Sequence, residues 1–272
     1  MEQSIIRIVK SFSPSIAHAL FRHSSDTDGG FYGNYRTWDE ACRASNGYDS
    51  DAILDRVKDA LLKVKSGEAV YERDSVLFDK VEYSWPLLAG LLWIASQEGN
   101  RLNIVDFGGS LGSSYYQNRH FLAHLPELKW NIIEQKKFVE CGKQCFEDEH
   151  LKFYYNLDDC LKEQKPDTIL LSSVIQYLEK PYDLLQEIIN KRFQYLVIDR
   201  TAFIEAGDDR ITVQKVPEQI YQASYPAWFF NEHKFLRFLS GSYTLMADFE
   251  SNDRVNIPSV FKGYIFKIKN DY

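Results

Sequence analysis

A glycine-rich segment and an acidic residue downstream of it have the types and spacing of a nucleotide-binding site. An apolar run ending at Phe107 leads into Gly108 and Gly109, and a second apolar run ends on Glu134, 22 positions after Gly112. Glycines after a strand let the backbone pass close to a ligand, and an acid after the next strand can accept hydrogen bonds from two ribose hydroxyls. The expected separation is about 20 residues, so the spacing predicts that the turn and the acid meet at one ligand.

The glycine pattern argues against a dinucleotide. With Gly109 and Gly112 as the second and third glycines of G-x-G-x-x-G, the bulky Phe107 would stand where the first glycine belongs. The segment from Asp106 to Gly112 instead resembles the D/E-x-G-x-G-x-G motif of class I S-adenosylmethionine-dependent methyltransferases, with Ser110 in place of the middle glycine. In that family the glycine loop approaches the methionine and ribose portions of the cofactor, and the later acid holds the ribose.

Composition excludes several classes of protein. The 272 residues are 44% hydrophobic and 26% charged, as is ordinary for a globular protein, and the net charge of −7 with no basic stripe makes nucleic acid a poor partner. The most apolar stretch, Leu87 to Ala95, is too short to span a bilayer, and the N-terminus lacks the apolar block of a signal peptide. The four cysteines lack zinc-ligand spacing. We therefore expect a cytoplasmic protein with no transmembrane segment and no metal.

The order of predicted elements indicates an α/β fold. Beyond residue 80 strands and helices alternate, which implies a parallel sheet with right-handed crossovers. The predicted strands are Leu102 to Phe107, Lys129 to Glu134, Leu151 to Tyr155, Thr168 to Ser172 and Tyr195 to Asp199, and the helices between and around them include Tyr83 to Ser96, Phe138 to Phe146 and Pro181 to Asn190. The runs Tyr243 to Phe249 and Gly263 to Lys269 have no helix between them and predict an antiparallel hairpin at the sheet edge.

We therefore predict a doubly wound, mostly parallel, seven-stranded sheet with a C-terminal antiparallel hairpin and an N-terminal helical cap. The cap is residues 1–80, which we interpret as helical and irregular, with a loop at Ser24 to Asn34 and a helix at Asp49 to Lys65. Residues 81–272 form the methyltransferase-like domain, with a substrate-lid insertion at about 202–240. Class I methyltransferases characteristically end in such a hairpin.

Five short strings extend the resemblance to a bacterial methyltransferase family whose members are often associated with surface-polysaccharide loci. They are Tyr71-Glu72-Arg73-Asp74-Ser75, Tyr83-Ser84-Trp85-Pro86, Asp106 to Gly112, Ser172-Ser173-Val174-Ile175-Gln176-Tyr177-Leu178 and Ile198-Asp199-Arg200-Thr201. The resemblance spans residues 83–269 and implies S-adenosylmethionine as cofactor.

Residue by residue, the resemblance implies a set of cofactor contacts. Gln135 flanks the adenine, and either Asn156 or Asp158 pairs with the adenine amine. Ser172 and Ser173 lie near the methionine end. The full predicted set is Tyr83, Asp106, Gly108, Gly109, Ser110, Gly112, Glu134, Gln135, Asn156, Asp158, Ser172 and Ser173.

Methyl transfer from a sulfonium needs in-line alignment and exclusion of water, and a hydroxyl acceptor also needs a base. Asp199 is the first candidate because it ends a strand at the edge where open α/β sheets place ligands, although an ion pair with Arg200 or a helix cap would also explain it. His233 is the second candidate, in an aromatic segment whose rings could stack on a sugar or pack on the core. The predicted acceptor-binding residues are Gln176, Arg200, Tyr225 and Trp228.

The sequence thus predicts S-adenosylmethionine-dependent methyl transfer to a hydroxyl of a small-molecule or glycan acceptor. One alternative is a nicotinamide-dependent oxidoreductase, against which Phe107 and the terminal hairpin argue. Another is a non-catalytic binding module with a methyltransferase-like fold, suggested by Ser110 and by Gln176-Tyr177, which stands where many relatives carry paired histidines. The acceptor and the oligomeric state do not follow from the sequence.

Overall fold

Five parallel strands form the centre of the computed structural model, which describes residues 29–47, 50–73, 76–78, 80–81, 83–217 and 223–270. The first, β4 (Arg101–Phe107), lies between β5 (Glu127–Ile133) and β7 (Thr168–Ser172). Strand β6 (Leu151–Tyr154) pairs with β5 on one side, and β8 (Tyr195–Ile204) pairs with β7 on the other. The predicted strands therefore lie within one residue or two of these bounds, except that β8 is five residues longer.

A C-terminal hairpin completes the predicted fold. Strand β12 (Val260–Ile268) runs antiparallel to β8, and β11 (Tyr243–Glu250) pairs antiparallel with β12. The order β6-β5-β4-β7-β8-β12-β11 confirms the doubly wound, mostly parallel sheet with its antiparallel end.

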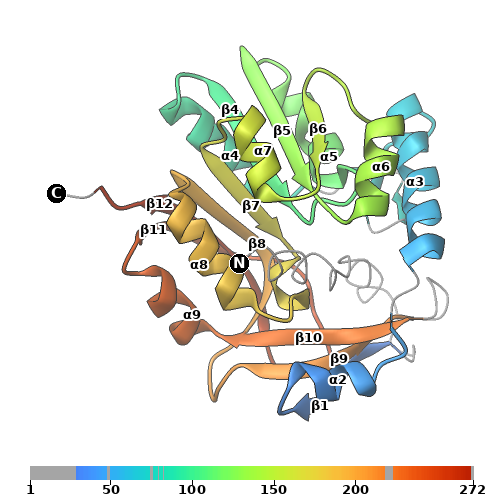
Figure 1. Ribbon diagram of the computed structural model, residues 1–272, viewed down its shortest axis with the longest axis vertical. Coiled ribbons are helices and arrows are strands. Elements are labelled where there is room, and N and C mark those ends of the chain that lie inside the picture. The colour runs from blue at the N-terminus through green and yellow to red at the C-terminus, as the bar shows by residue number, and fades with distance from the viewer. Residues whose placement is uncertain are drawn as a thin grey trace.

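Three further strands raise the sheet to ten strands in the described part of the chain, so the predicted number of seven was too low. Strands β1 (Gly30–Tyr35), β9 (Arg210–Lys215) and β10 (Ser224–Asn231) pair antiparallel in that order, and the end of β10 joins the end of β8 in parallel. They lie at the bottom of the view in Figure 1, beyond the carboxyl end of β8. Residues 30–34, predicted as loop, are thus strand, because pairing with a distant segment outweighs the local turn-forming glycines. Residues 1–28 and 218–222, which the cap and insertion predictions also cover, lie outside the described residues.

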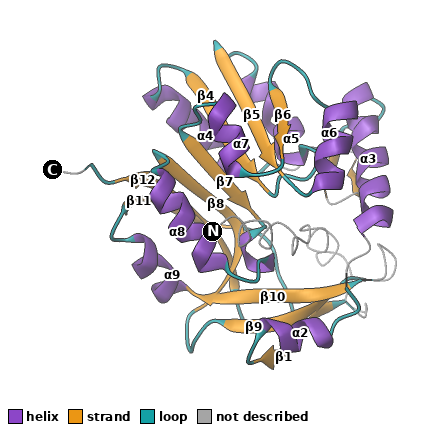
Figure 2. Ribbon diagram, viewed as in Figure 1, coloured by secondary structure: helices purple, strands orange, loops and turns teal. Residues whose placement is uncertain are grey.

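Helices cover both faces of the parallel strands (Figure 2). Their bounds are α2 Trp38–Arg43, α3 Ser50–Ser66, α4 Trp85–Gln97, α5 Ser113–Leu122, α6 Lys136–Cys145, α7 Leu157–Glu163, α8 Pro181–Lys191 and α9 Glu232–Leu239. Alternate residues of β4 show the two layers, since Ile104 packs in the core cluster of α3 to α6 and Val105 in that of α7 to α9. In the residues described, no helix is both long and apolar enough to cross a membrane.

Candidate functional site

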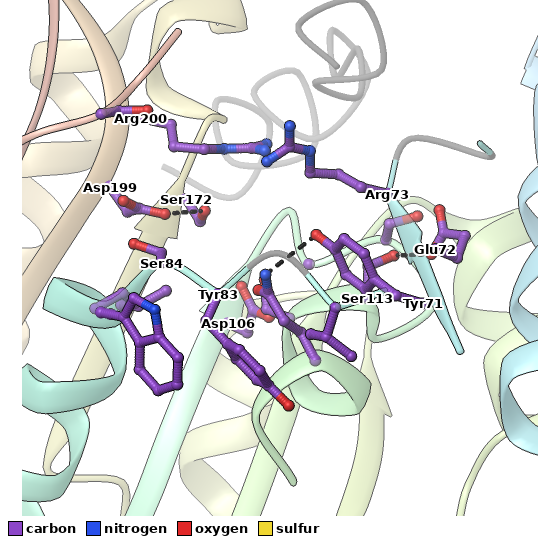
Figure 3. Close-up of a pocket in the computed structure, with 18 of the residues that line it drawn as sticks. Tyr71, Glu72, Arg73, Tyr83, Ser84, Asp106, Ser113, Ser172, Asp199 and Arg200 are labelled. Atoms are coloured by element: carbon purple, nitrogen blue, oxygen red, sulfur yellow. Dashed lines mark hydrogen bonds between the residues drawn. The ribbon is translucent and has the colours of Figure 1, made fainter. Parts of the chain in front are cut away.

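A cavity of about 640 Å³ opens at the carboxyl ends of β4 and β7, beside the middle of β8. The chain leaves β4 towards β5 on one side, and the later strands β7 and β8 lie on the other, so this is the point at which the strand order reverses. Open α/β sheets bind their ligands at such a point, and the volume is that of a pocket for a small molecule. The residues drawn in Figure 3 show that its wall is made largely of polar and charged side chains.

The turn between β4 and α5 forms one side of this cavity. Gly108, Ser110 and Gly112 have φ angles of +72°, +55° and +106°, in the region that favours glycine. Gly109 is required for another reason, because a Cβ there would lie 2.6 Å from the carboxylate of Asp106. Ser110, which stands in place of the middle glycine of the motif, therefore has a left-handed backbone conformation. Its hydroxyl is buried and has no hydrogen-bond partner among the described residues.

Two buried carboxyl groups adjoin the glycine turn. Asp106 accepts a hydrogen bond of 2.9 Å from Trp130 Nε1, and Glu134 accepts from the backbone N–H of Ser110 at 3.2 Å and of Gln135 at 2.8 Å. Burial raises the pKa of each carboxyl group to about 7, against the lowering effect of these hydrogen bonds. The acid that ends β5 thus faces the glycine turn, as the spacing predicted, although its side chain does not line the cavity wall.

Asp199 is a buried acid of the cavity wall at the carboxyl side of β7. Its Oδ2 accepts a hydrogen bond of 3.0 Å from the Ser172 hydroxyl, whereas Oδ1 has no hydrogen-bond partner in the described part of the chain. Burial raises the pKa of this carboxyl group, and the nearby charges of Arg200 and Arg73 oppose that rise. A carboxylate with one unsatisfied oxygen and a raised pKa is suited to accept a proton.

A bulge in β8 brings two consecutive side chains to the same cavity. Ile198 is opposite Tyr264 of β12 and Thr201 is opposite Lys262, so Asp199 and Arg200 together face a single residue, Gly263. Successive side chains of a regular strand point to opposite faces, but Arg200 has a φ of +48° and both side chains line the cavity.

The opposite wall comes from the hairpin of β2 (Tyr71–Arg73) and β3 (Val76–Phe78). The Ser113 hydroxyl donates to the Glu72 carboxylate at 2.8 Å, and Gln117 Nε2 donates to the Tyr71 hydroxyl at 3.1 Å, so the hairpin is fixed to the first turns of α5 (Figure 3). Sequence reasoning assigned no role to this segment. The only signal was the string of residues 71–75 quoted above for its resemblance.

The structure brings eight of the predicted site residues into the cavity wall. These are Tyr83, Asp106, Gly108, Gly109, Ser110, Ser172, Asp199 and Arg200. The other predicted residues do not line it: Gly112, Glu134, Gln135, Asn156, Asp158, Ser173, Gln176, Tyr225, Trp228 and His233. Of these, Gly112 begins α5, and Glu134 contacts the turn as described.

Several residues outside the wall have structural contacts of their own. Asn156 caps α7 by accepting from the backbone N–H of Asp159 at 2.8 Å, and Asp158 pairs with Lys191. Gln176 is buried, and its amide donates to the Ser173 hydroxyl and to the Arg200 carbonyl, both at 3.2 Å. Gln176 thus binds the backbone of the β8 bulge at Arg200, and Ser173 in turn binds Gln176.

The aromatic segment packs on the core instead of lining the cavity. The ring of Tyr225 meets that of Tyr177 edge-on at 5.6 Å, and Trp228 Nε1 donates to the Leu178 carbonyl at 2.9 Å. His233 lies on the exposed side of α9, beside Arg237. The structure therefore does not bring His233, Tyr225 or Trp228 to the cavity. The reason is that β10 and α9 pack their aromatic side chains into the hydrophobic core.

Comparisons with known proteins give structural likenesses alone. No protein-family model matches the sequence, and no match is found among curated proteins. The N-terminal domain of EvdMO1, solved in the presence of S-adenosylhomocysteine and D-fucose, is 12% identical, with 82% of this chain and 98% of that chain covered and a TM-score of 0.49. Magnesium protoporphyrin IX methyltransferase from Synechocystis PCC 6803 with bound S-adenosylmethionine is 12% identical, with coverages of 99% and 98% and a TM-score of 0.45.

A third likeness is to the 1,6-didemethyltoxoflavin-N1-methyltransferase of Burkholderia thailandensis, at 12% identity, coverages of 91% and 99%, and a TM-score of 0.42. At these identities and scores the function has to be argued from the site itself.

Proposed function

We propose that this protein transfers a methyl group from S-adenosylmethionine to a hydroxyl group of a small-molecule or saccharide acceptor. The observation that carries the proposal is that the glycine turn lies in the wall of one cavity with Asp199, whose Oδ1 has no hydrogen bond to any described residue, at the switch point of the sheet. The turn supplies a nucleoside-binding surface, and the carboxylate supplies a proton acceptor. The saccharide part of the proposal comes from the resemblance to a family found at surface-polysaccharide loci.

The residues present fit the cofactor. A side chain at Gly109 would meet the Asp106 carboxyl group, so this position stays glycine and the turn presents Gly108 and Gly109, which have no side chains, to the cavity. The buried Ser110 hydroxyl has a hydrogen-bonding capacity that no described residue uses. Buried carboxyl groups at Asp106 and Glu134 favour a ligand that carries positive charge, as the sulfonium and amino groups of S-adenosylmethionine do.

S-adenosylmethionine, when bound, supplies a methyl group on a positively charged sulfur that leaves as a neutral thioether. The tasks of the chain are then to hold the acceptor oxygen in line and to remove its proton. In such a transfer Asp199 Oδ1 would accept the proton of the acceptor hydroxyl. The Ser172 hydroxyl keeps the carboxylate oriented through its hydrogen bond to Oδ2.

Isothermal titration with S-adenosylhomocysteine and with NAD tests the cofactor. We expect S-adenosylhomocysteine to bind and NAD to give no response. We also expect Glu134→Gln to weaken S-adenosylhomocysteine binding about tenfold, which corresponds to about 1.4 kcal/mol. The matched control Glu127→Gln, at the partly exposed start of β5, should leave binding unchanged. Binding of NAD without a response to S-adenosylhomocysteine would refute the proposal.

A further inference from the structure

Two arginine side chains reach the cavity from opposite walls. Arg73 ends β2, and Arg200 occupies the bulge of β8. Figure 3 shows the two side chains extending towards one another across the space above Asp199 and Ser172. The charges of both arginines act on the Asp199 carboxyl group, which places them near the same acid.

The acids around this arginine pair differ in their surroundings. Asp199 lies beside the pair; burial and the nearby Asp253 raise its pKa, whereas the charges of the two arginines lower it. Glu72 is buried and accepts from Ser113, whereas Asp106 is held under the glycine turn by Trp130. Glu250 belongs to the exposed end of β11, and Lys80 adds a further cation to the wall. Two guanidinium groups and two buried acids, Asp199 and Asp253, therefore lie close together on the side of the cavity away from the glycine turn.

The backbone at Arg200 adopts an unfavourable conformation in this arrangement. A non-glycine residue at a φ of +48° is strained by roughly 1–2 kcal/mol, and at Arg200 the strain delivers a guanidinium to the cavity next to the carboxylate of Asp199. Guanidinium groups match carboxylate and phosphate oxygens through paired N–H donors, which makes arginine the usual residue for recognising such groups.

We propose that the methyl acceptor carries an anionic group, a carboxylate or a phosphate, that Arg73 and Arg200 hold while Asp199 faces the reacting hydroxyl. The inference rests on the proposed function, since it describes the acceptor side of the same cavity. It narrows the acceptor class to hydroxylated acids or phosphate esters, with uronic acids and sugar phosphates as the saccharide members of that class.

The test is titration of the full chain with inorganic phosphate, and separately with acetate, in chloride buffer with S-adenosylhomocysteine present at saturation. Saturation fills any site for the cofactor's own carboxylate, so anion binding that persists reports a second site. The variants are Arg73→Gln and Arg200→Gln, and the control is Arg237→Gln, which removes an exposed arginine of α9 outside the cavity. Circular dichroism shows whether each variant folds, and Arg73→Lys and Arg200→Lys retain the charge without the paired donors.

We expect phosphate or acetate to bind the saturated wild-type protein and each glutamine variant to bind it at least tenfold more weakly. The lysine variants should lie in between, and Arg237→Gln should match the wild type. Phosphate binding stronger than acetate binding would favour a phosphate ester, and the reverse order a carboxylic acid. The proposal is overturned if the saturated wild-type protein binds neither anion, or if the glutamine variants bind the anions as well as wild type does. It is also overturned if the folded glutamine variants lose S-adenosylhomocysteine affinity instead of anion affinity, because the arginines would then bind the cofactor. Failure of S-adenosylhomocysteine to bind wild-type protein would refute the proposed function, whereas the anion titration without it would still test the arginine pair.

Discussion

The carboxylate of Asp106 lies directly under Gly109, where an added Cβ would be 2.6 Å from its Oδ2. An acid and a glycine three positions apart in the motif are therefore one structural unit, in which the absence of a side chain at Gly109 leaves room for the buried carboxyl group. Trp130 holds that group from the neighbouring strand through a 2.9 Å hydrogen bond.

Gly109→Ala should distort the turn, because the new methyl group meets the Asp106 carboxyl group instead of a flexible side-chain end. We expect a loss of about 1–3 kcal/mol in the free energy of unfolding and a clear loss of S-adenosylhomocysteine affinity. Denaturant unfolding and isothermal titration measure the two effects. The control Gly241→Ala has open space at its Cβ and should change neither quantity. A Gly109→Ala variant as stable and as tightly binding as wild type would contradict this packing.

Asp106→Asn should change how stability depends on pH. Burial raises the pKa of Asp106 from 3.8 to about 7 in the folded protein, so the folded state retains a proton that the unfolded state releases. The carboxyl group therefore destabilises the fold progressively as the pH rises from about 4 to about 7, and fully above that. We expect the free energy of unfolding of the asparagine variant without ligand to exceed that of wild type at pH 8 by about 4 kcal/mol, and this advantage to be lost near pH 4. Parallel stability curves for the two proteins in urea unfolding would rule out the raised pKa.

Asp199→Asn should separate catalysis from cofactor binding. An asparagine retains an acceptor oxygen for the Ser172 hydroxyl but cannot take a proton. We expect turnover to fall about 100-fold or more, with S-adenosylhomocysteine affinity within about twofold of wild type. Release of S-adenosylhomocysteine with a hydroxyl acceptor that supports wild-type turnover gives the rate. Asp248→Asn, on the exposed face of β11, is the control. Undiminished turnover would remove Asp199 from the reaction.

Ser110→Gly should relieve a strained position. The φ of +55° costs a serine roughly 1–2 kcal/mol, and the buried hydroxyl is unsatisfied in the described structure. We expect the glycine variant to unfold at an equal or higher urea concentration. Its S-adenosylhomocysteine affinity distinguishes two roles for the hydroxyl: weaker binding in a stable variant would show that the ligand uses it, and stronger binding that only the backbone matters. A less stable variant would contradict the strain.

The part of the site that could be predicted from sequence depends on local patterns. Alternating strands and helices fix which loops meet at the carboxyl edge of the sheet, so the turn at Gly108 and the acids Glu134 and Asp199 were found from their places after apolar runs. The strand predicted to end at Asp199 continues to Ile204, because no pattern in the residues that follow Asp199 predicts a bulge.

The rest depends on contacts between distant segments. Gly30 pairs with Lys215, and Arg73 reaches the cavity only because its hairpin binds α5 through Ser113 and Gln117. No periodicity within residues 71–78 encodes that contact. Tyr225 and Trp228 of β10 were predicted as acceptor contacts for the same reason, since composition alone does not distinguish a ring in a pocket from a ring packed beside Tyr177 and Leu178.

Because of the bulge at Asp199 and Arg200, the number of residues in β8 decides which side chains reach the cavity. Gly263 permits it, because a side chain there would meet the Ile198 carbonyl and the ring of Phe249. A chain one residue shorter between Ile198 and Thr201 would regain a regular ladder with β12. Such a chain could present either the acid or the guanidinium to the cavity, but not both.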